Sequence, residues 1–193
     1  RIHWPTNCRR CTLSSDGRSL LMVTTEPLTS SRSRSGRTPT SNGELGKASV
    51  TVWDAVSGQK RMEYTLEEDE QTVTATNISD DGKRIMVVVH NEYDAHVLVW
   101  DTYASKIVYE LDMRSLSDTV NWSVTSAFLS GDGNTIVTCE RLSDEHGCTI
   151  GTKCIKLRDV NTGCVVDEFP ATITGPSTVD SCSYIAANVS AIS

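Results

Sequence analysis

A stretch built around Trp-Asp, or a close variant of it, recurs along this chain and limits what it can fold into. The copies are ASVTVWDAVSGQKRMEYTL at 48–66, HVLVWDTYASKIVYEL at 96–111 and CIKLRDVNTGCVVDEF at 154–169. In the first copy Val50 and Val52 alternate with residues of the other face, and a period of two rich in β-branched residues is typical of a strand. Each copy therefore predicts a strand, a turn entered by Asp54, Asp101 or Asp159, and a second strand.

An Asp-Gly pair precedes each copy and predicts a tight hairpin. An apolar run follows each pair, at 19–24, 84–89 and 135–139; the pairs are Asp16-Gly17, Asp81-Gly82 and Asp132-Gly133. Asp-Gly between two strand-like runs is a strong hairpin signal, because the turn needs a positive φ that glycine adopts without steric cost. Each unit is therefore expected to hold four strands, named a to d in chain order, with a variable loop between b and c.

Four short strands per unit with a repeating Trp-Asp resemble the WD-repeat β-propeller family. The resemblance covers roughly residues 7–170 and rests on Trp53-Asp54, Trp100-Asp101, the degenerate Arg158-Asp159 and the Asp-Gly turns. It implies an all-β fold of four-stranded antiparallel blades, with about three blades in this chain.

The repeat divides the chain into successive blades. The expected blades are blade 1 at 8–66, blade 2 at 73–111 and blade 3 at 123–169. Residues 1–7 are expected to form an entry segment or the outer strand of a preceding blade, and residues 179–193 resemble the start of a further blade. A closed propeller usually has four to eight blades. We therefore expect these 193 residues, which begin at Arg1, to belong to a larger protein.

The chain departs from the family pattern in its spacing and its polar residues. Asp54 and Asp101 are 47 residues apart and Asp101 and Asp159 are 58 apart, against a usual period of about 40–45, so the units carry insertions. The Gly-His pair that the family often places before strand a is missing, and only Asp94 stands where the family often has a buried Asp in the b–c turn. The resemblance therefore implies an incomplete buried hydrogen-bond network.

Long loops are expected on one face of the propeller and tight turns on the other. The family's strand order puts b–c and d–a loops on one face, and the long segments 26–46, 90–96, 112–122 and 140–153 are all of these types. Functional residues often lie on loops held by a rigid scaffold. We therefore predict partner contact on the long-loop face.

Basic, acidic and aromatic residues on that face are candidates for partner binding. The insertion 26–46 is rich in Pro, Gly and Ser without apolar periodicity, which predicts a mobile loop; its Arg-x-Ser runs also fit kinase target sites. The acidic run at 67–70 would bind a basic partner, although a solvated surface also explains it. Trp122 would be an exposed anchor for a partner, although packing against the blade also explains it. The candidates are Arg32, Arg34, Arg37, Glu67, Glu68, Asp69, Glu70 and Trp122.

No arrangement of residues in the sequence indicates catalysis or a cofactor. Cys8-x-x-Cys11 has zinc-like spacing, but no second close Cys pair accompanies it. A Gly-x-Ser-x-Gly elbow and a phosphate-binding Gly-rich loop are both missing. Strand a should line the central channel, and its residues at 72–77 and 123–127 include few titratable groups. We therefore expect no enzyme activity, no cofactor and no bound metal.

Charge and cysteine content narrow the expected environment. A net charge of −7 gives no indication of a surface for nucleic acid, and the apolar runs are shorter than the roughly 20 residues of a membrane helix. The seven cysteines are odd in number and several fall in predicted strands, which favours a reducing compartment. The expected location is the cytoplasm, with the nucleus as the alternative.

The family resemblance implies a non-catalytic protein–protein interaction scaffold that presents long loops to a partner. A narrower version is a sensor or regulatory domain of a larger NACHT-type or apoptosome-type NTPase. The competing class is a propeller-based enzyme, which would need carboxylates or histidines from two blades to converge in a pocket. The expected partner is another protein or the rest of a larger propeller, and open end blades would also allow self-association.

Overall fold

Twelve strands in three antiparallel sheets make up the part of the chain that the structure describes. The computed structural model describes residues 7–25, 47–66, 72–90, 95–112, 120–144 and 153–171. These residues contain no helix, and hence none long and apolar enough to span a membrane. Each sheet pairs four strands in their order along the chain, as the sequence predicted. We call the sheets blades 1, 2 and 3.

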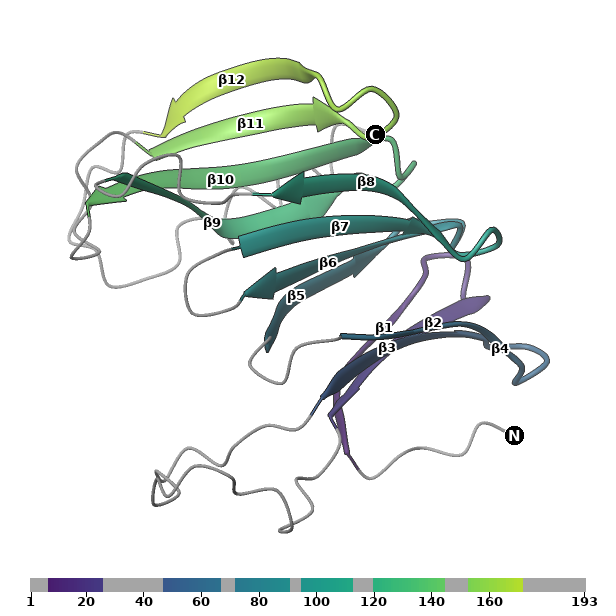
Figure 1. Ribbon diagram of the computed structural model, residues 1–193. Coiled ribbons are helices and arrows are strands. Elements are labelled where there is room, and N and C mark those ends of the chain that lie inside the picture. The colour runs from purple at the N-terminus through teal and green to yellow at the C-terminus, as the bar shows by residue number, and fades with distance from the viewer. Residues whose placement is uncertain are drawn as a thin grey trace, which may run out of the picture.

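The blades follow one another along the chain. Blade 1 consists of β1 (Cys8–Leu13), β2 (Ser19–Thr25), β3 (Ala48–Asp54) and β4 (Lys60–Thr65). Blade 2 consists of β5 (Thr72–Ile78), β6 (Arg84–His90), β7 (Ala95–Asp101) and β8 (Lys106–Asp112). Blade 3 consists of β9 (Val120–Leu129), β10 (Thr135–Asp144), β11 (Lys153–Asp159) and β12 (Val165–Ala171). Blade 2 lies between the other two, and its first strand contacts both β1 and β9 (Figure 1).

Blade 2 is buried on both faces, and the period of its strands explains how. On β6, Ile85 and Val87 join the core shared with blade 1, whereas Met86 and Val88 join the core shared with blade 3. All four side chains are at most 1% exposed. Since successive side chains of a strand point to opposite faces, one apolar run fills both cores. We call the contact between blades 1 and 2 the first seam and that between blades 2 and 3 the second seam.

Trp100 is the largest side chain in the first seam. It is 2% exposed in β7, and its ring centroid lies 5.0 Å from that of Tyr64 in β4, with an angle of 52° between the rings. Such tilted pairs suit the charge distribution of aromatic rings. Trp53, the equivalent residue of blade 1, is only partly buried, and its Nε1 donates a 3.1 Å hydrogen bond to Thr51 Oγ1. The two Trp-Asp pairs therefore have different surroundings.

Blade 3 extends beyond its expected boundaries. β9 begins at Val120 and β10 continues to Asp144, so the predicted link 112–122 and loop 140–153 are wrong where these strands replace them. The extra residues stay paired, with Trp122 opposite Leu142. The polar stretch after position 139 suggested a loop, but pairing with the strand-forming Val120 and Trp122 overrides that local preference.

Replacing Trp100 by Ala should destabilise the protein far more than replacing Trp53 by Ala. Truncating a buried aromatic side chain typically costs about 3–5 kcal/mol, whereas the partly buried Trp53 should cost about 1 kcal/mol because less of its surface leaves water on folding. Urea unfolding followed by circular dichroism measures both losses. Equal losses would contradict the placement of Trp100 in a seam that Trp53 does not share.

Candidate functional site

The three Asp-Gly turns share one hydrogen-bond pattern. In each turn the Asp carboxylate accepts from a serine hydroxyl two residues earlier and from the backbone N–H two residues later, over 2.5–3.0 Å. The serine hydroxyl in turn accepts from the N–H five residues after it, over 2.9–3.0 Å. Gly17, Gly82 and Gly133 have φ values of 67–73°. The positive φ expected for Asp-Gly hairpins is therefore observed in every unit.

The turns between the third and fourth strands are held by a second carboxylate pattern. Oδ1 of Asp54, Asp101 and Asp159 accepts from the N–H groups two and three residues later, over 2.7–3.0 Å. The residue after each Asp also donates its N–H to the neighbouring Asp-Gly turn, over 2.8–2.9 Å. Both kinds of turn therefore lie on one side of the molecule, which we call the turn face.

These hydrogen bonds change the acidity of the turn carboxyls. The largest cause is a serine hydroxyl at Asp16 and Asp132, in two of the Asp-Gly turns, and a backbone N–H at Asp54 and Asp159, in two of the turns after the third strand. Each holds the carboxyl pKa below its usual range; the carboxyls are Asp16, Asp132, Asp54 and Asp159. Hydrogen bonds to the charged form favour that form, so the turns use ionised Asp as a structural acceptor.

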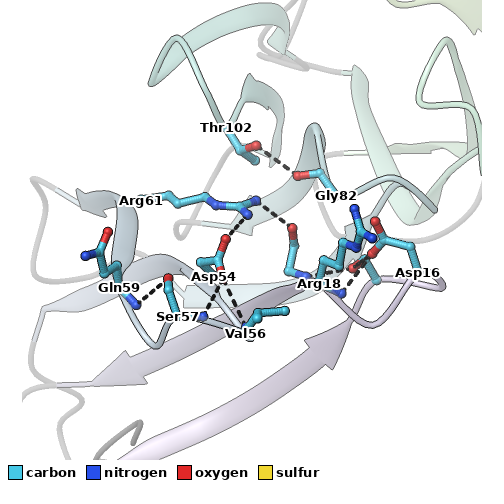
Figure 2. A network of polar contacts seen from close by, with 11 residues as sticks. Asp16, Arg18, Asp54, Val56, Ser57, Gln59, Arg61, Gly82 and Thr102 are labelled. Atoms are coloured by element: carbon cyan, nitrogen blue, oxygen red, sulfur yellow. Dashed lines mark hydrogen bonds and ion pairs between the residues drawn. The ribbon is translucent and has the colours of Figure 1, made fainter.

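Arg61 connects the turns of blade 1 with those of blade 2. Figure 2 shows its guanidinium reaching Asp54, with which it forms an ion pair, and it donates a 2.9 Å hydrogen bond to Ser19 Oγ. It also lies 5.1 Å from the centroid of the Tyr103 ring in blade 2. A cation over an aromatic ring at an exposed site contributes about 0.5–1 kcal/mol. The turn face is therefore braced across the first seam by polar contacts.

Asp80, beside the Asp-Gly turn of blade 2, forms hydrogen bonds to the Asp-Gly turns of both neighbouring blades. Its N–H donates to Gly131 O over 2.7 Å, and its carbonyl accepts from Asp16 N–H over 3.1 Å. Its carboxylate accepts from the Ser15 hydroxyl. Arg84 adds a link to blade 3 by donating to the backbone carbonyl of that Asp-Gly turn over 3.0 Å. The turn face is thus one hydrogen-bonded surface rather than separate loops.

Apolar side chains stand out from this braced surface. Val56 is 80% exposed and Tyr103 is 64% exposed, each two residues after the Asp of its turn. Leu13 is also 54% exposed, but it lies at the end of β1 opposite Leu20, on the face of blade 1 that points away from blade 2 rather than on the turn face. Within the described ranges, no group of three or more His, Cys, Asp or Glu side chains is placed to hold a metal ion. What the described surface offers is fixed apolar contact points.

The sequence interpretation missed a buried ionic cluster in blade 3. Glu140 is 1% exposed and accepts from Arg158 Nη2 at 2.7 Å, Lys156 Nζ at 2.8 Å and Thr138 Oγ1 at 2.9 Å. Burial acts to raise the pKa of Glu140, but these three donors outweigh it and hold the pKa below its usual value. The sequence predicts a loop from position 140 onward, whereas β10 continues to Asp144 and includes Glu140. The signal for the cluster lies in the cross-strand register, which needs the fold to be known.

The structure places only part of the predicted residue set. Trp53 and Trp100 lie in β3 and β7, and the aspartates and glycines of the repeats lie in the turns. Trp122 lies in β9, opposite Leu142, within a paired strand rather than a link. The insertion 26–46, the lead-in 1–6 and 179–193 lie outside the described residues, as do Arg32, Arg34, Arg37, Glu67, Glu68, Asp69, Glu70 and Asp94.

Solved structures similar to this one fix the fold. They include the β-propeller domain of the trilobed protease from Pyrococcus furiosus, at 13% identity and a TM-score of 0.52, covering 89% of this chain and 46% of that one. The Pyrococcus horikoshii acylaminoacyl peptidase matches at 16% identity and a TM-score of 0.52, over 90% and 27% of the two chains. The tricorn protease matches at 17% and 0.53, over 89% and 14%. No protein-family model and no curated protein sequence matches the chain.

The described blades are therefore blades of a β-propeller. The chain spans less than half the length of each of these structures. At such low identity the likeness concerns the fold, and the proteases among the matches carry nothing over to the chemistry of this chain.

Acid should weaken the fold through the turn carboxyls. A carboxyl whose pKa is lower in the folded than in the unfolded chain stabilises fully above its unfolded pKa, about 4, and loses that contribution as the pH falls further. We expect the urea midpoint to fall between pH 5 and pH 3. Asp132→Asn should reduce this pH dependence, whereas Glu63→Gln, an exposed carboxylate outside the turns, should preserve it. A pH dependence unchanged by Asp132→Asn would contradict the proposed role of the turns.

Proposed function

We propose that this chain is a non-catalytic scaffold for protein–protein interactions, in which propeller blades present their open faces to another protein. The observation that carries the proposal is the exposure of Leu13. Leu13, Ile78 and Leu129 each end the first strand of their blade. They are 54%, 8% and 6% exposed, respectively.

The difference among these three residues follows from their neighbours. Ile78 is buried in the core of the first seam, and Leu129 is buried in the core of the second. Leu13 occupies the same position in blade 1, where no described blade precedes it. In blades 2 and 3 the preceding blade buries the residue at this position. The exposed Leu13 therefore marks a surface of blade 1 that is suited to the apolar face of another blade.

The opposite end of the array is open in a complementary way. Tyr64, Leu111 and Phe169 face equivalent residues of the third strand, and Tyr64 and Leu111 pack against the seam cores. Phe169, in blade 3, is 46% exposed. Leu13 and Phe169 therefore mark the two faces of one kind of contact, which can repeat head to tail between copies of the chain. The partner is either such a copy or another protein with a blade-like face.

The way in which the described carboxylates are used supports a non-catalytic role. The aspartates of the turns accept backbone and hydroxyl hydrogen bonds, and Glu140 is neutralised by two cations. A catalytic acid or base needs a group that can reach a substrate. Membership of the WD-repeat family is the narrower form of the proposal; the Trp100–Tyr64 contact and the repeated turn carboxylates support it.

We also propose that the protein resides in a reducing compartment, namely the cytoplasm. Cys8, Cys11 and Cys164 carry free thiols. Burial and the neighbouring Cys11 raise the pKa of Cys8, which keeps that thiol protonated and less reactive.

Sedimentation velocity of the purified chain across a concentration series tests the scaffold proposal. Association that grows with concentration is expected, and Leu13→Asp and Phe169→Asp should each weaken it at least tenfold, because each buries a charge in the contact. Val56→Asp is the matched control, since Val56 is more exposed than either but lies on the turn face. A monomer at every concentration, or an equal effect of all three variants, would overturn the proposed contact between copies of the chain.

A further inference from the structure

Three residues of each blade form a row that faces the preceding blade, which we call the leading row. In blade 2, Ile85 lies opposite both Ile78 and Trp100, and all three are buried in the core of the first seam. The register of blade 1 gives it the equivalent row Leu13, Leu20 and Trp53. Leu13 is 54% exposed, and the other two residues are only partly buried. The row that fills a core in blade 2 is therefore open in blade 1.

A second row faces the following blade, and we call it the trailing row. In blade 2 it consists of Val88, Val97 and Leu111, which contribute to the core of the second seam. The register of blade 3 gives it the equivalent row Cys139, Ile155 and Phe169. Val97 is 0% exposed, whereas Ile155 is only partly buried and Phe169 is 46% exposed. The trailing row is therefore open in blade 3.

The two open rows carry the chemistry of the first seam. In that seam Tyr64 of blade 1 packs on Trp100 of blade 2, with 5.0 Å between the ring centroids. Blade 3 has Phe169 at the position of Tyr64, and blade 1 has Trp53 at the position of Trp100. The ammonium group of Lys60 lies 5.8 Å from the centroid of the Trp53 ring, where Trp100 has an aromatic neighbour. The two ends of the array are thus complementary to each other.

The second seam differs from the open ends at these positions. It has Leu111 and Arg158 there, and Arg158 is neutralised within its own blade by Glu140 at 2.7 Å. Blade 1 has Thr24 at the position of Glu140, so an arginine at position 53 would lack that carboxylate. Trp53 instead suits an aromatic partner, because tilted ring pairs contribute beyond the area that they bury.

The number of blades limits how many copies such a contact can join. A closed propeller usually has four to eight blades. Each copy has three described blades, so one copy falls below that range, two copies give six blades and three copies exceed it. A head-to-tail contact forms a ring when its rotation closes. In a ring of two copies, both open rows of each copy would be covered.

We propose that two copies of this chain close head to tail into a ring of six blades, in which Phe169 of each copy packs on Trp53 of the other. The proposal rests on the scaffold function proposed above and narrows its partner to a second copy. Each contact between the copies repeats the aromatic contact of the first seam, and burial of the two open rows drives closure.

Mixing two variants tests the direction of the contact. Leu13→Asp disables the leading row and Phe169→Asp disables the trailing row, because each places a charge in the contact. In sedimentation velocity, each variant alone should be a monomer at concentrations where the unmodified chain is a dimer. An equimolar mixture should form a one-to-one dimer, because the first variant keeps its trailing row and the second keeps its leading row. This dimer should be weaker than the unmodified one, since it has one intact contact instead of two.

The outcomes separate this proposal from the scaffold function on which it rests. A mixture that stays monomeric while the unmodified chain associates would overturn the ring and leave the association itself in place. Unmodified assemblies larger than two copies would overturn the ring in the same way. A monomeric unmodified chain would overturn both the ring and the association between copies.

Substitutions at the aromatic pair test the contact itself. Phe169→Tyr, which copies Tyr64, should keep the dissociation constant of the dimer within about threefold, because the two side chains have similar volumes. Trp53→Arg, which copies Arg158 without its carboxylate, should raise that constant at least about tenfold. Phe169→Arg should do the same, and it keeps the test decisive if Trp53→Arg does not fold, because Phe169 is exposed in the single copy. A dissociation constant that Phe169→Arg leaves unchanged would overturn the proposed pair.

Discussion

The packing of one blade face on the next is the constraint on which this structure depends. A four-stranded sheet with apolar residues on both faces cannot be stable alone, because each face must be removed from water. Blade 2 meets this condition, with Ile85 directed to one core and Met86 to the other. Blades 1 and 3 each have one face in a seam. The exposure of Leu13 and Phe169 follows from this arrangement, as does the expectation that another blade-like surface covers them.

The turn face explains why aspartate recurs so regularly in this sequence. A tight turn leaves several backbone N–H groups without partners, and an ionised carboxylate can accept two of them at once. Asp159, for example, accepts from the N–H groups of Asn161 and Thr162 over 2.9 and 2.8 Å. These turns then contact one another across the seams through Asp80 and Arg61. The repeated carboxylates are therefore part of the framework, and they fix the relative positions of the exposed side chains around them.

Local signals predicted the fold, whereas the contacts between distant residues needed the structure. Alternation along strands and Asp-Gly pairs depend on neighbours in sequence, so they predicted the blades and the φ of Gly17, Gly82 and Gly133. The extent of β10 depends on pairing with β9, and the burial of Glu140 depends on the register with β11. Neither the length of β10 nor the burial of Glu140 can be read from a short segment of neighbouring residues in the sequence. The predicted partner-binding residues, apart from Trp122, lie outside the described part of the chain and stay predictions.

The change from Trp to Arg before Asp159 illustrates how a degenerate repeat can keep its fold and change its energetics. An arginine alone at this position would leave a buried, unpaired charge, which is among the costliest changes in a protein core. Glu140 on the neighbouring strand supplies the compensating charge, and Thr138 completes its hydrogen bonding. Glu140, Arg158 and Thr138 therefore contact one another within blade 3, and the effects of substituting them are expected to be non-additive. Trp100 needs no such partner charge, because dispersion and apolar burial are distributed over many contacts.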